Sequence, residues 1–201
     1  MGLLSNSATF VRFTVEGEMP ENFWEFAADR IAANAFKDID DNHEEYSIGW
    51  VSVMNMFDSQ FAYASHAVGD YIVLSMRIDE RKVPSSVLKK FCMKEEERVR
   101  KEKQVPKLNR GHRLDIKESV KLMLTKKAVP IPAVYDLCWN LANNTVLVFS
   151  ASAAVHAALE DLFKETFGLH LVQQVPYLAA AHLLGPDQEA ALAAMESSIL
   201  L

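Results

Sequence analysis

The sequence predicts an α+β fold, with mixed or antiparallel sheets, packed helices and a protruding two-helix basic arm. Strand-like and helix-like segments follow one another without the regular βαβα alternation of a doubly wound sheet. Two turn signals, Gly69-Asp70 and Asn143-Asn144, each join a pair of strand-like runs, as in antiparallel hairpins. Between these turns, residues 81–127 carry sixteen of the chain's 21 Lys and Arg but six of its 27 Asp and Glu, which gives this block a net charge of +10.

Residues 1–83 are expected to form an N-terminal α+β portion. Pro20 begins a helix whose apolar residues recur at four-residue spacing from Phe23 onwards. The acidic stretch at residues 37–45 is typical of a solvated loop. Gly69 tolerates the positive φ that a tight hairpin turn requires. Strands are predicted at residues 8–15, 46–51, 61–68 and 71–78.

Residues 84–128 predict the arm. Pro84 ends the sheet region, and Ser85 or Ser86 can cap a helix that is apolar only in its first turns. After Met93 this helix becomes polar on all sides, which is typical of a helix that leaves the core. The expected ion pairs, four residues apart, are Glu96 with Arg100 and Glu97 with Lys101.

A second helix is expected to return toward the sheet. Pro106 and Gly111 break the first helix, and Asp115 with Glu118 resembles a capping box. The apolar side of the returning helix is predicted to carry Ile116, Val120 and Leu124.

Residues 129–201 are expected to form a C-terminal α+β portion. Residues 135–141 and 145–150 predict a hairpin. They are followed by a helix that ends at Gly168, a strand at 170–175 and a last helix that begins at Pro186. Core positions are predicted for Trp24, Trp50 and Trp139.

The composition excludes several classes of protein. Apolar residues make up 50% of the chain, enough for a sizeable core, yet no stretch approaches the ~18 apolar residues of a membrane span. The N-terminus lacks the basic start of a signal peptide, and Asn6 stands where a myristoylation site has Ser or Thr. Cys92 and Cys138 form no disulfide framework and are expected to be small core residues. We therefore expect a protein of the reducing cytoplasm, without membrane association.

The basic block on an acidic body is typical of a surface that meets a polyanion. Its one aromatic residue is Phe91, so it lacks the stacking platforms of single-strand binders, and we expect contacts with duplex phosphates without base reading. The competing interpretations are a solvated helix pair and a protein–protein adaptor that docks an acidic partner, such as the acidic body of a dimer mate. The candidate DNA-binding residues are Lys89, Lys90, Lys94, Arg98, Arg100, Lys101, Lys103, Lys107, Arg110, Arg113, Lys117, Lys121, Lys126 and Lys127.

No motif of an enzyme family stands out. The six histidines are scattered, without HExxH or CxxC, and no P-loop or dinucleotide fingerprint occurs. Asp70 with Glu80-Arg81-Lys82 superficially matches the D…ExK pattern of metal-dependent nucleases. If residues 71–78 form one strand, however, Asp70 and Glu80 lie roughly 30 Å apart and cannot share a metal. We therefore expect no enzymatic activity, catalytic residue, metal or cofactor, and a nuclease is the least favoured interpretation.

Several segments occur in an order that matches a known family. They are MGLLSN at the start, the motif Ile48-Gly49-Trp50-Val51, the hairpin through Gly69, the runs KVPSSVLKK and KEEERVRKEK, residues 136–152, and LVQQVPY after Gly168. Together they resemble the recombination-associated RdgC family over most of the chain. Members of that family continue past the point where this chain stops at Leu201, so the resemblance implies a shortened member that lacks the C-terminal part.

The resemblance implies a cytoplasmic, nucleoid-associated protein that binds double-stranded DNA without marked sequence preference. Family members form homodimers that close into a ring, and they oppose the RecA recombinase by occupying DNA. The arm would then meet its counterpart in the partner subunit, in a ring or an open clamp. A family Phe at the arm's base aligns with Val129, so the candidate dimer-interface residues are Val129 and Pro130.

Overall fold

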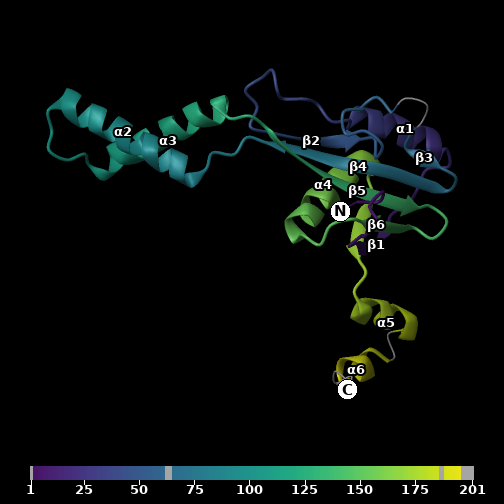
Figure 1. The fold of residues 1–201 in the computed structure, drawn as a ribbon. Coiled ribbons are helices and arrows are strands. Elements are labelled where there is room, and N and C mark those ends of the chain that lie inside the picture. Colours follow the sequence, from purple (N-terminus) through teal and green to yellow (C-terminus); the bar gives the residue numbers. More distant parts are fainter. Residues whose placement is uncertain (1, 62–64, 186–187, 196–201) are drawn as a thin grey trace.

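A computed structural model describes residues 2–61, 65–185 and 188–195 as a sheet with packed helices and a helical arm projecting from one end (Figure 1). The strands are β1 (Val11–Glu16), β2 (Tyr46–Val51), β3 (Ala67–Val68), β4 (Tyr71–Glu80), β5 (Ile131–Asn140), β6 (Thr145–Val148) and β7 (His170–Gln173). The helices are α1 (Phe23–Ala33), α2 (Ser85–Lys103), α3 (Arg110–Lys127), α4 (Ala153–Phe167), α5 (Pro176–Leu184) and α6 (Glu189–Ala193). None of these helices is long and apolar enough to cross a membrane.

The seven strands form one antiparallel sheet in the order β2-β4-β5-β6-β1-β7, with β3 paired to β4. Strands from both residues 1–83 and residues 129–201 therefore belong to the same sheet. The predicted α+β class is confirmed, as are both hairpins. Gly69 (φ 60°) and Asn144 (φ 51°) take the left-handed backbone conformation that these turns require.

The main core lies between one face of the sheet and the helices α1 and α4. Alternation along β4 directs Ile72, Leu74 and Met76 into this core, and all three are fully buried. Trp50 and Trp139 are also fully buried, as predicted. The core prediction for Trp24 is wrong: its side chain is 42% exposed, because the α1 residues that pack inward are Phe23, Ala27 and Ile31.

Gly49 permits a close approach of two chain segments at the edge of the sheet. The backbone of Ala35 and Phe36 runs alongside β2 at this point, in a parallel bridge between Ala35 and Trp50, and Phe36 donates a backbone hydrogen bond to Trp50 at 2.9 Å. A methyl group at position 49 would lie 2.5 Å from Cα of Phe36 and 2.6 Å from its nitrogen. The Ile48-Gly49-Trp50-Val51 motif thus combines a required glycine with a buried tryptophan.

Three sequence predictions about local structure need correction. Of the strand expected at residues 61–68, the described part forms only Ala67–Val68, since Phe61 has a φ of 52° and leaves the extended conformation; residues 62–64 lie outside the described residues. Neither Ser85 nor Ser86 caps α2, because the helix already begins at Ser85 with Pro84 in the cap position. The capping box predicted for α3 is also wrong: the side chain of Asn109 caps that helix through the backbone N–H of His112 at 2.8 Å.

The C-terminal helices also differ from the expectation. α5 was not expected, because its Ala-rich sequence lacks a clear amphipathic period. The last helix, predicted from Pro186, is observed as α6, Glu189–Ala193; Pro186 and residues 196–201 lie outside the described residues.

Replacing Gly49 with Ala should lower the free energy of unfolding by about 2–4 kcal/mol, since the new methyl group meets backbone that cannot move aside cheaply. Gly111→Ala is the matched control. Its methyl group would meet only Asn109 Oδ1 at 3.5 Å, inside α3, and should raise stability by up to about 1 kcal/mol. Urea unfolding measures both changes, and an equal decrease in the two variants would contradict the close-approach argument.

Candidate nucleic-acid interface

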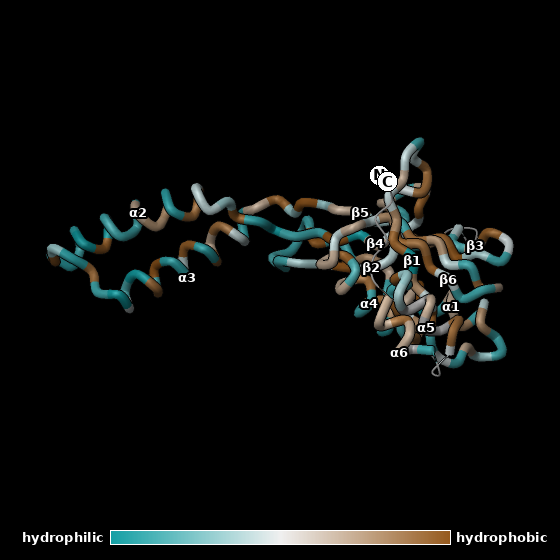
Figure 2. Tube along the Cα trace, turned by 90° about the horizontal axis from the view of Figure 1, so that it is seen from below, coloured by the Kyte–Doolittle hydropathy of each residue, from teal (hydrophilic) through white to brown (hydrophobic). Residues whose placement is uncertain are grey.

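The arm consists of α2 and α3, packed side by side along a small apolar seam. Leu108, Ile116 and Val120 are buried in it, and five residues pack against them: Leu88, Phe91, Cys92, Val99 and Leu124. The predicted apolar side of the returning helix is therefore confirmed. In Figure 2, α2 is coloured mostly hydrophilic, whereas hydrophobic segments gather in the strands of the sheet. A seam this narrow leaves most of each helix surface to polar side chains.

All fourteen candidate DNA-binding residues are exposed. Six of them gather on one side of the arm, which we call the cationic face: Lys89, Lys107, Arg110, Arg113, Lys117 and Lys121. These residues line three adjoining hollows, at the tip, the middle and the base of the arm. The tip and middle hollows share Arg110 and Arg113, and the middle and base hollows share Leu88, so the face is continuous.

Few carboxylates oppose this row of cations. Among the described residues that line the tip and middle hollows, Glu96 is the one acid, and its carboxylate lies 3.9 Å from Arg113. Glu45 and Glu80 enter only at the base. The cationic face thus keeps a positive field over most of its length, which attracts polyanions.

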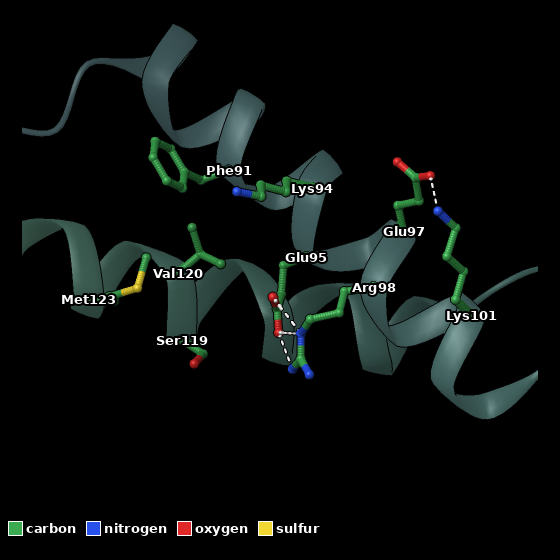
Figure 3. Close-up of a pocket in the computed structure, with 9 residues that line it drawn as sticks. All are labelled: Phe91, Lys94, Glu95, Glu97, Arg98, Lys101, Ser119, Val120 and Met123. Atoms are coloured by element: carbon green, nitrogen blue, oxygen red, sulfur yellow. Dashed lines mark hydrogen bonds and ion pairs between the residues drawn. The ribbon is translucent and has the colours of Figure 1, made fainter.

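The opposite side of the arm is neutralised by ion pairs. A hollow there is lined by Lys94, Arg98 and Lys101 together with Glu95 and Glu97 (Figure 3). Arg98 lies 2.6 Å from Glu95 and 3.2 Å from Glu102, and Lys101 lies 2.8 Å from Glu97. Hydrogen bonds from Arg98 and Lys101 lower the pKa of Glu95 and of Glu97, respectively, so both carboxylates are charged at neutral pH.

The ion pairs predicted within α2 are half confirmed. Glu97 pairs with Lys101, as expected, but Glu96 reaches across to Arg113 of α3 rather than to Arg100. The spacing of residues 110, 113, 117 and 121 could have placed these four cations on one side of α3, but not the position of that side relative to α2. The remaining candidates line neither hollow system: Lys90, Arg100, Lys103, Lys126 and Lys127.

The two candidate interface residues differ in exposure. Val129 is 78% exposed at the base of the arm, and neighbouring Ile131 is 55% exposed. Pro130 is buried within its own chain. Val129 is thus available to a partner, whereas the side chain of Pro130 is not.

Arg81 holds the base of the arm together, a role that its sequence context did not indicate. Its buried guanidinium donates hydrogen bonds to backbone carbonyls of the acidic loop, at 2.9 Å to Glu44, 2.7 Å to Ile39 and 2.9 Å to Asn42. It also donates to the carbonyl of Ala128, where the chain leaves α3. Arg81 therefore ties the end of β4, the acidic loop and the end of the arm to one another, and it is not free to bind phosphate.

The possible nuclease residues do not converge. β4 runs without interruption from Tyr71 to Glu80, so Asp70 precedes one end of this ten-residue strand and Glu80 forms the other end. Glu80 instead pairs with Lys82 at 2.9 Å. Within the described ranges, no group of three or more His, Cys, Asp or Glu residues could hold a metal.

Burial raises the pKa of the Cys92 thiol and of the Cys138 thiol, which keeps both in the neutral form at neutral pH.

Arg81→Lys should lower the free energy of unfolding by about 2–3 kcal/mol, because an ammonium group cannot serve the several carbonyls that the guanidinium fork reaches. The neighbouring exposed cation provides the control: Lys82→Ala should leave the stability unchanged, because an exposed ion pair contributes little. Urea unfolding measures the stability, and limited proteolysis should show faster cleavage at residues 39–45 in Arg81→Lys only. Equal behaviour of the two variants would refute the proposed role of Arg81.

The comparison with known proteins agrees with the sequence resemblance. A search of curated proteins finds no match. A family model described as "Putative exonuclease, RdgC" matches residues 9–183, a range that contains all seven strands and the whole arm. The match supports a role associated with DNA and recombination. Because it covers most of the 201 residues, the chain belongs to the RdgC family.

Proposed function

We propose that this protein is a non-enzymatic, sequence-nonspecific binder of double-stranded DNA. In this proposal it is a dimer of the cytoplasmic nucleoid, and it modulates RecA-dependent recombination by occupying DNA. The observation that carries the proposal is the cationic face, where six exposed Lys and Arg side chains follow the arm from base to tip. A projecting arm can present such a face to a duplex while the acidic body stays away from the phosphates.

The dimensions of the arm suit a phosphate backbone. α2 has 19 residues and therefore extends about 28 Å. At about 3.4 Å per nucleotide along one strand, this length corresponds to about eight phosphates. The exposed side chains of α2 and α3 can reach these phosphates without entering a groove, which supports binding without base readout.

The side-chain types of the cationic face favour a duplex over a single strand. Single-strand binders stack bases on aromatic rings. Phe91, the arm's aromatic residue, lines the hollow on the opposite side (Figure 3). A base therefore has no ring to stack on among the residues that line the tip and middle hollows.

Dimerisation at the arm is the second part of the proposal. Val129 and Ile131 form an exposed aliphatic pair beside the point where the arm leaves the sheet. Contact between such pairs in two subunits would orient two cationic faces around one duplex, in a ring or an open clamp. Occupied DNA of this kind would be withheld from RecA.

Reversing charge on the cationic face should weaken duplex binding far more than reversing charge on the opposite side. We expect Lys117→Glu/Lys121→Glu to bind a random duplex at least about tenfold more weakly, and the slope of log K against log salt to fall by about 0.9 for each phosphate that the variant no longer neutralises. The control, Lys94→Glu/Lys101→Glu, changes the net charge equally. Fluorescence anisotropy over a salt series measures both. Equally weakened binding in the two double variants would refute the assignment of DNA binding to the cationic face, and binding that does not respond to salt would overturn the DNA-binding model itself.

Incubation with Mg²⁺ and duplex DNA should release no nucleotides above the background of a buffer control, since Asp70 and Glu80 of the D…ExK pattern lie at opposite ends of β4. Asp70→Ala serves as the second arm of the assay. Magnesium-dependent degradation that disappears in Asp70→Ala would establish a nuclease and refute the non-enzymatic part of the proposal.

A further inference from the structure

The middle hollow of the cationic face has a lining that phosphate contacts do not require. Its volume is about 470 Å³, and its apolar lining residues are Leu88, Cys92 and Leu114. Leu114 is 48% exposed although it lies beside the seam of the arm. An apolar floor offers nothing to a phosphate group, and this hollow offers no aromatic ring to a base.

The rim of the same hollow is strongly positive. Lys89, Arg110, Arg113 and Lys117 line the hollow together with the apolar residues, and Glu96 is the one acid among the described residues of its lining. The hollow on the opposite side also has an apolar part, made by Phe91, Val120 and Met123, but there Arg98 and Lys101 are held in ion pairs. Of these two hollows, the middle hollow is therefore the one that combines an apolar surface with a largely unpaired positive charge.

We propose that the middle hollow binds an acidic peptide segment of a protein partner, with one large apolar side chain of the peptide on Leu88, Cys92 and Leu114. Carboxylates on either side of that side chain pair with the rim cations. The continuity with the tip hollow favours an extended segment over a small ligand, since Lys107, Arg110 and Arg113 carry the row of cations onward along the arm. This inference goes beyond duplex binding, which needs only the cations.

Duplex DNA and the peptide share Arg110, Arg113 and Lys117, so they compete for the arm. A partner that presents such a segment would displace the arm from DNA. The apolar floor separates the two activities, because only the peptide uses it. This separation supplies the test.

The probe is a fluorescein-labelled peptide with one phenylalanine flanked on both sides by aspartates, and its binding is measured by fluorescence anisotropy. Replacing the phenylalanine of the peptide with alanine should weaken binding to the unmodified protein by about tenfold. Leu114→Ser should weaken binding of the phenylalanine peptide by a similar factor and leave duplex affinity within about twofold. Unlabelled duplex should displace the bound peptide.

The matched control is Leu122→Ser, on the same helix. Leu122 is 51% exposed, close to the 48% of Leu114, but it does not line the hollow. Leu122→Ser should bind peptide and duplex as the unmodified protein does. Since both leucines are exposed, circular dichroism should show both variants folded; if Leu114→Ser is not folded, the comparison of the two peptides on the unmodified protein decides.

The proposal would be overturned by equal affinity for the phenylalanine and alanine peptides, by unchanged peptide binding in folded Leu114→Ser, or by equally weakened peptide binding in Leu122→Ser. A dimer that dissociates in Leu114→Ser, without peptide binding by the unmodified protein, would also overturn it and would assign the hollow to a second copy of the chain. If the protein binds the peptide but not the duplex, the proposed DNA binding is refuted and the peptide site stands. If it binds the duplex but not the peptide, the peptide site is refuted and the proposed DNA binding stands.

Discussion

Ten consecutive residue pairs join β4 to β5, from Tyr71 with Asn140 to Glu80 with Ile131, and both parts of the molecule are organised around them. On one side of this pairing lies the core under α1 and α4. At its far end the two strands continue into the arm. Paired strands are about 4.8 Å apart, whereas packed helices need about 8–10 Å between their axes, so the chain must diverge between sheet and arm. Arg81 lies where the chain leaves β4 for the arm, and it donates a hydrogen bond to the carbonyl of Ala128, where the chain returns from α3 to β5.

The arm combines weak internal packing with strong surface charge. Its seam buries three residues, which is a small apolar contribution for two helices of 19 and 18 residues. The ion pairs on its neutralised side are exposed to solvent and therefore stabilise the arm only slightly. Among the described residues, the pairing of Glu96 with Arg113 is the one that compensates charge on the cationic face. The arm therefore has two different sides. The charges on the neutralised side are paired with one another and support the helices, whereas most charges on the cationic face are available to a ligand.

Local patterns in the sequence were sufficient for most elements. Alternating apolar residues placed β2 and β4, glycine and asparagine turns placed the hairpins, and Gly168 ended α4 as expected. The errors arose where tertiary contacts decide. The short β3 follows from the backbone conformation of Phe61, and the exposure of Trp24 follows from the way α1 rotates onto the sheet.

The candidate site was predictable as a region but not as a surface. Composition alone located the basic block at residues 81–127. The division between Lys117 on the cationic face and Arg98 on the neutralised side depends on how α2 and α3 face each other. Arg81 is indistinguishable in sequence from the cations that follow it, and only its burial among the carbonyls of another loop reveals its structural role.

The order of strands in the sheet has a consequence for synthesis on the ribosome. β1 is the first strand made, yet its neighbours are β6 and β7, so the partners of Val11 and Val15 are Val148 and Leu171. The arm, by contrast, closes through contacts between α2 and α3 that are near in sequence, and such local contacts form early. During translation the arm can therefore be helical before β6 and β7, the partners of β1, have been made. For that interval the edge of β5 with which β6 will pair is open, and folding of the body is limited by the arrival of its C-terminal strands.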